Sequence, residues 1–107
     1  LAPDFVDITL TPNPVRYGEK ATFKLLHNRP GCNMNVSIEL FDFQGQILWR
    51  YDERVETEGS VCEVDWNVTS QSGTPLATGV YLYRATLSEN GGSERTKTRK
   101  LILLNNK

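Results

Sequence analysis

Few residues of this 107-residue chain could carry out catalysis. The one histidine, His27, is followed five residues later by Cys32, so the two could act as base and nucleophile. The sequence supplies neither an orienting acid nor an oxyanion site for them, and a surface histidine is the simpler interpretation. Glu63 and Asp65 share one face of an expected strand, but this spacing is too common in strands to indicate a glycosidase. We therefore expect no enzyme activity in this chain.

Metal ligands are equally sparse. One histidine and two separated cysteines cannot complete a structural zinc site without carboxylate ligands. Calcium would need clustered oxygen ligands, and the nearest candidates lack a recognisable loop spacing. These candidates are Asp42, Asp52, Glu53 and Glu56. Solvated side chains are the simpler interpretation, so we expect neither a metal nor a cofactor.

The two cysteines, Cys32 and Cys62, could be paired. A disulfide would close a loop of about thirty residues, worth roughly 3 to 4 kcal/mol in the chain-entropy model. An isolated pair in a small all-β domain suits an oxidising compartment, and this favours the disulfide. The alternative is two free thiols, with Cys62 buried as a small apolar residue.

The aromatic residues could form a flat platform for carbohydrate. Trp49 and Trp66, however, lie in phase with aliphatic residues on the inward faces of their expected strands. We therefore predict that both tryptophans pack in the core.

Composition indicates one ordinary globular domain. The chain is 38% hydrophobic and 23% charged, with a net charge of −1, so no overall field attracts it to nucleic acid or to an anionic membrane. No apolar run is long enough to span a membrane. The chain starts with Leu1-Ala2-Pro3 rather than Met, so we expect a single domain, residues 1–107, taken from a longer protein.

Period-two alternation of apolar and polar residues runs through most of the chain and is typical of half-buried strands. About seven strands are expected, separated by turns rich in Gly, Pro, Asn and Ser. They cover residues 5–11, 20–26, 36–40, 47–51, 61–66 and the two arms of a hairpin on either side of residues 89–93. The pattern predicts an all-β fold, an immunoglobulin-like antiparallel β-sandwich.

The second arm of this hairpin changes character along its length. Residues 95–100 alternate Thr with Lys or Arg, as on the solvated face of an edge strand. Residues 101–104 are apolar on both faces. Such a segment either completes the sheet of its own domain or is offered to a partner.

Four short motifs occur in an order and spacing more specific than any one of them. They are Pro12-Asn13-Pro14-Val15, Leu40-Phe41-Asp42 with Gly45, Gly73-Thr74-Pro75-Leu76-Ala77-Thr78-Gly79-Val80-Tyr81-Leu82-Tyr83-Arg84, and Arg99-Lys100-Leu101-Ile102-Leu103. Together they resemble the C-terminal sorting domain of type IX secretion proteins of Bacteroidetes, over nearly the whole chain.

The resemblance implies a secretion signal. Such domains are immunoglobulin-like sandwiches that direct their parent protein across the periplasm to the outer membrane and cell surface. They bind shuttle and translocon components, and a gingipain-like sortase often removes them. Ala77 stands where many members have Pro, and the chain has two cysteines and a polar tail of residues 105–107. In these departures the chain resembles a domain that the sortase itself retains, so the parent could be a cysteine peptidase.

We expect the partner to bind the end of the last strand. Lys100, Leu101, Ile102 and Leu103 would pair with a receptor edge through the main chain while their side chains enter pockets. Gly79, Val80 and Tyr81 would hold the neighbouring strand. The alternative is that Leu101 and Leu103 simply close the core.

Two other functions stay open. The domain could be an accessory immunoglobulin-like or carbohydrate-binding module of an extracellular enzyme. It could also be a structural module resembling those of flagellar hook caps, which would self-associate weakly.

Overall fold

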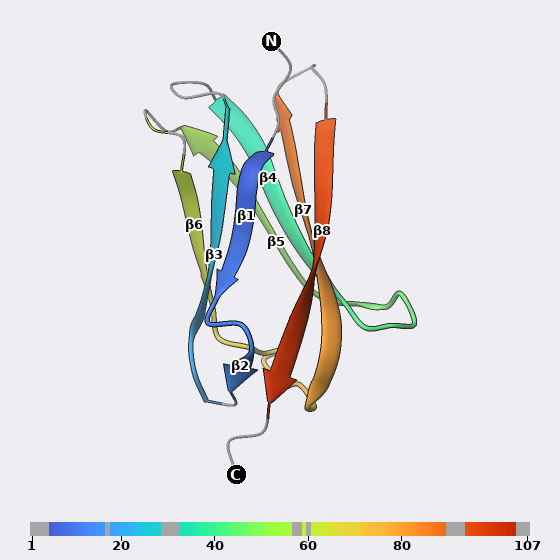
Figure 1. Ribbon diagram of the computed structural model, residues 1–107. Coiled ribbons are helices and arrows are strands. Elements are labelled where there is room, and N and C mark those ends of the chain that lie inside the picture. The colour runs from blue at the N-terminus through green and yellow to red at the C-terminus, as the bar shows by residue number, and fades with distance from the viewer. Residues whose placement is uncertain are drawn as a thin grey trace.

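A computed structural model describes residues 5–16, 18–28, 33–56, 59, 61–89 and 94–104, which form two sheets packed face to face (Figure 1). The three-stranded sheet has the order β1 (Phe5–Thr11), β3 (Ala21–His27), β6 (Val61–Trp66). The five-stranded sheet has the order β2 (Val15–Arg16), β8 (Glu94–Leu104), β7 (Gly79–Glu89), β4 (Asn33–Phe41), β5 (Ile47–Glu56). The predicted all-β, immunoglobulin-like sandwich is confirmed.

The short strand β2 was not expected from the sequence. The chain leaves the first sheet at Thr11, passes Pro12 and Pro14, and joins the second sheet as β2. Its two residues, Val15 and Arg16, pair in parallel with Leu103 and Leu104 of β8. A two-residue strand is too short to show a period, so the sequence pattern could not reveal it.

The core lies between the sheets and is centred on aromatic rings. Phe23 of β3 is fully buried, and its ring centroid lies 5.9 Å from that of Trp49, 5.8 Å from that of Trp66 and 5.1 Å from that of Tyr83. Trp66 is buried, whereas Trp49 is partly buried and packs against the core. The predicted core role of both tryptophans is confirmed.

The last hairpin forms as predicted, with β7 and β8 paired from Ser88 and Glu94 to Gly79 and Leu103. The residues that connect the two arms, 90–93, lie outside the described part of the chain. Leu101 and Leu103 are 0% and 1% exposed and belong to the core. The apolar end of β8 therefore completes the sheet of its own domain.

Asn13 closes the edge of β8 just before β2 takes over. Its side-chain Nδ2 donates to the carbonyl oxygen of Lys100 at 3.0 Å, and its Oδ1 accepts from the backbone N–H of Ile102 at 3.1 Å. One amide side chain thus makes the two hydrogen bonds that a strand residue would make. Since β2 pairs with the next two residues, the edge of β8 is covered from Lys100 onwards.

The opposite edge of the same sheet, on β5, is closed in a similar way. The backbone N–H of Gln71 donates to the carbonyl oxygen of Leu48, and the Gln71 side-chain Oε1 accepts from the backbone N–H of Arg50, both at 2.8 Å. Gln71 lies in the long connection from β6 to β7, which crosses between the sheets as predicted. Both sheet edges are therefore protected from strand addition at these positions.

We predict that Asn13→Ala lowers the free energy of unfolding by about 1 to 2 kcal/mol, because two hydrogen bonds to the β8 main chain are lost. Urea denaturation measures this change. The control is Asn67→Ala at an exposed loop position, which should change stability by less than about 0.5 kcal/mol. Equal effects of the two substitutions would contradict the role assigned to Asn13.

Candidate functional site

The seven residues predicted to bind a partner divide between the two faces of the five-stranded sheet. Tyr81, Leu101 and Leu103 point inward and are buried. Lys100 is exposed, whereas Val80 and Ile102 are half-buried and stand opposite each other on the outer face. Only this second group presents side chains that a partner could contact.

The expected free edge at residues 100–103 is closed by described residues, so strand addition at this segment would first have to displace Asn13 and β2. On one side β7 pairs with this segment, and on the other Asn13 and β2 occupy the main chain. The sequence could not show this, because the closing groups are a side chain and a two-residue strand about ninety residues away. Binding of a partner to these residues stays a prediction.

Gly79 and Tyr81 have structural roles at the start of β7. Gly79 has φ +157°, a conformation that L side chains rarely adopt, although an added Cβ would meet no atom within 4 Å. The Tyr81 hydroxyl donates to the carbonyl oxygen of Ala77, four residues upstream. Such a hydrogen bond fixes a corner between the two sheets of immunoglobulin-like domains. Burial raises the pKa of Tyr81, which keeps the hydroxyl protonated as a donor.

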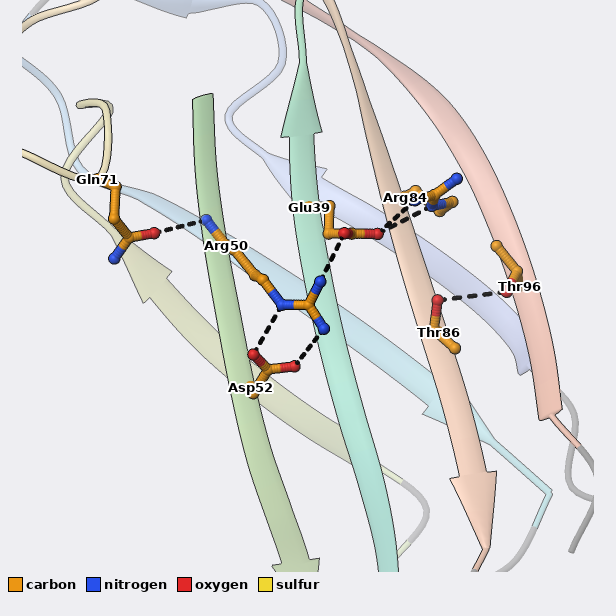
Figure 2. Close-up of polar contacts among 7 residues, drawn as sticks. All are labelled: Glu39, Arg50, Asp52, Gln71, Arg84, Thr86 and Thr96. Carbon is orange, nitrogen blue, oxygen red and sulfur yellow. Dashed lines mark hydrogen bonds and ion pairs between the residues drawn. The ribbon is translucent and has the colours of Figure 1, made fainter. Parts of the chain in front are cut away.

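An ion-pair network on the outer face was missed by sequence reasoning (Figure 2). Glu39 of β4 accepts from Arg84 of β7 at 2.6 Å and 3.0 Å and from Arg50 of β5 at 2.8 Å. Arg50 also binds Asp52 at 2.8 Å and 3.2 Å, and this hydrogen bonding raises the pKa of Arg50. The Glu39 side chain is only 7% exposed because the two arginines cover it. The network joins three strands across the sheet.

An apolar strip borders this network where β8 ends. Arg84 stacks over Phe41 with its guanidinium carbon 4.6 Å from the ring centroid. Phe41 pairs with Leu82, and in the next row Val80 pairs with Ile102. The nearby β4–β5 connection projects from the body of the sandwich (Figure 1) and carries Phe43, which is 70% exposed. The outer face thus has an apolar end beside a charged centre.

His27 corrects a prediction, because it is 2% exposed rather than on the surface. It follows Ala21, Phe23 and Leu25 in the inward phase of β3, so the alternation of that strand buries it. Burial lowers the pKa of His27. A buried neutral imidazole at the end of a core strand is a structural residue rather than a surface base.

Cys62, the cysteine that the structure describes, lies in an environment that disfavours reactivity. Among the described residues Cys62 is buried and has no disulfide partner, and burial raises its pKa, which disfavours the reactive thiolate. Cys32 lies outside the described residues, so the pairing of the two stays a prediction.

Two of the carboxylates weighed as calcium ligands, Asp42 and Asp52, make other contacts. Asp42 Oδ1 accepts from the backbone N–H groups of Gln44 and Gln46, both at 2.9 Å, and Asp52 binds Arg50. Within the described ranges, no three potential ligands gather into a metal-binding group. The same residues include no helix of the length and apolarity needed to cross a membrane.

One solved structure matches this chain in both fold and sequence. Over 98% of the chain, it superposes on latent PorU from Porphyromonas gingivalis, crystallised as a dimer, with a TM-score of 0.84 and 34% identity. The predicted resemblance to type IX secretion proteins is confirmed. The chain spans about a tenth of the length of PorU, since it covers 10% of that protein.

Other comparisons add only the fold. CopC from Methylosinus trichosporium OB3b matches 98% of this chain and 96% of its own, with a TM-score of 0.61 and 14% identity. At that identity the likeness to CopC shows a shared sandwich and nothing of its function. No family model and no curated protein matches the chain.

We predict that Glu39→Gln costs about 1.5 to 3 kcal/mol of unfolding free energy, because a covered carboxylate that accepts from two arginines is lost. Asp52→Asn is the matched control, since it removes an exposed carboxylate from the same network and should cost less than about 1 kcal/mol. Urea denaturation of both variants decides the matter. A loss for Asp52→Asn as large as that for Glu39→Gln would show that burial does not set the strength of this network.

A pH dependence follows from His27. Its pKa in the folded state is lowered from 6.5 by burial, so as the pH falls the unfolded chain takes up this proton before the folded chain does. The stability contributed by neutral His27 is therefore complete above about pH 6.5 and declines below it. We expect His27→Gln to lose less unfolding free energy than the wild type between about pH 7.5 and about pH 5. Denaturant titrations at the two pH values measure these losses. If the wild type and His27→Gln lose the same unfolding free energy, this assignment is contradicted.

Proposed function

We propose that this domain is a secretion signal that directs its parent protein through the type IX system to the outer membrane and cell surface. The observation that carries this proposal is the match to PorU at 34% identity and a TM-score of 0.84 over 98% of the chain. The domain would act by binding shuttle or translocon components after it has folded in the periplasm. Chemistry would belong to other parts of the parent protein.

The side chains that remain exposed limit where a shuttle or translocon component could bind. Leu101 and Leu103 are already used by the core, and the main chain around them is hydrogen-bonded within the domain. Lys100, Val80 and Ile102 instead share the outer face with Leu82 and Phe41. We therefore place recognition on this outer face, through side chains, rather than on main-chain pairing at the end of β8.

A reporter fusion tests the function. A fluorescent protein with a periplasmic signal peptide would carry the 107-residue domain at its C-terminus, in a bacterium with a type IX system and in its translocon-deficient mutant. We expect surface or extracellular reporter in the first strain and periplasmic reporter in the second. Equal distributions with and without the domain would reject the secretion function.

Point variants then test the binding surface. Removing residues 100–107 would delete two core leucines and could not separate folding from recognition. The double variant Lys100→Glu and Ile102→Lys changes the outer face instead, and Thr98→Glu, farther along the exposed strand, is its control. With both variants folded by circular dichroism, only the double variant should leave the reporter in the periplasm. Normal export of the double variant would reject this surface but not the function.

A further inference from the structure

The five-stranded sheet has both edges closed over only part of their length. Asn13 and β2 cover β8 from Lys100 onwards, and Gln71 covers β5 at Leu48 and Arg50. Among the described residues, no strand pairs with the outer side of β8 before Lys100 or of β5 after Arg50. The two open stretches lie at the same end of the sheet, because Glu94 and Arg54 both align with Ser88 and Asn35 on the central strands.

The side to which the N–H and C=O groups point on the open stretches can be worked out from the closed stretches of the same strands. The N–H and C=O of one strand residue point to the same side, and this side alternates along the strand. Since Lys100 C=O and Ile102 N–H face away from β7, the main-chain groups of Thr96 do so too. By the same reasoning from Arg50 N–H, those of Arg54 face away from β4. Within the part of the chain that the structure describes, each edge therefore offers main-chain donors and acceptors that no strand pairs with.

The two open edges carry different charges. On β8 the exposed or partly exposed side chains include Arg95, Lys97 and Arg99, all in phase with inward Leu101. On β5, Glu53 lies on that same face of the sheet, next to Asp52 on the other face. Like charges directly opposite each other destabilise a strand pair and opposite charges stabilise it. Pairing of β8 with another β8 is therefore disfavoured.

We propose that the occupant of the open β8 edge is β5 of a second copy of this chain. Within one copy β8 and β5 run in opposite directions, so two copies in the same orientation bring these edges together antiparallel. A register with Asp52 opposite Thr96 places Glu53 opposite Arg95 on one face. It also places Arg54 opposite Glu94 on the other face.

The contact is head-to-tail and does not close on itself, so it leads to chains of copies rather than a sealed dimer. Few residues pair and the charges are exposed, so the association is weak, appears at high protein concentration and decreases as salt screens the charges. This proposal concerns the isolated domain and does not depend on the secretion function.

Two proline variants of the full 107-residue chain test the proposal. Proline is tolerated on an edge strand where its missing N–H would face outward, as at Thr96 and at Arg54. Thr96→Pro should block the β8 edge and Arg54→Pro the β5 edge. By sedimentation velocity at low salt and up to millimolar concentration, we expect the wild type to form a series of oligomers. Each variant alone should stay monomeric, and an equimolar mixture should form dimers but nothing larger.

Three results would overturn the proposal: a monomeric wild type at every concentration, oligomers of Arg54→Pro alone, or a mixture that stays monomeric although the wild type associates. Should a proline variant fail to unfold cooperatively, charge reversal replaces it. Arg95→Glu and Glu53→Arg should each weaken wild-type-like association several-fold, and mixing the two should restore it, because the reversed charges then face each other. No recovery in the mixture would likewise reject the proposed register.

Discussion

The structure depends on closing the edge of its last strand. A main-chain group at a sheet edge needs a partner or water, and an exposed edge invites pairing with other chains. Here Asn13 and the two residues of β2 take up the edge of β8 over the stretch whose side chains, Leu101 and Leu103, fill the core. The beginning and the end of the described chain are thereby joined. This contact converts an apolar terminal segment from an exposed peptide into part of the sandwich.

This constraint shapes how a domain similar to part of PorU can be recognised. A receptor that needed the main chain of residues 100–103 would first have to displace Asn13 and β2. The outer face needs no such change, because Val80 and Ile102 already stand there beside Leu82 and Phe41. The network around Glu39 joins β4, β5 and β7 beside this surface, on the same outer face. In the proposed recognition, the inner face of these strands packs the core and their outer face meets the receptor.

Much of the fold could be predicted from period-two alternation, which is a property of each strand by itself. The inward positions of Phe23, Trp66 and Leu101 follow from it, and the same alternation extended to His27 would have placed that residue in the core. The features that could not be predicted depend on which strands become neighbours in the fold. Alternation places Glu39 on the solvent side of its strand. It is covered by Arg50 and Arg84, which lie 11 and 45 positions later in the sequence. Asn13 likewise gains its role from a strand 87 to 89 positions later.

Amide hydrogen exchange along β8 tests directly whether Asn13 closes the edge of this strand. The N–H groups of Ile102 and Thr96 both face away from β7, and among the described residues only that of Ile102 has an acceptor, the Asn13 side chain. We expect slow exchange at Ile102 and exchange at Thr96 close to that of an unstructured peptide. Exchange at Ile102 as fast as at Thr96 would show that the edge of the last strand is open, and would contradict the closure on which the structure is explained.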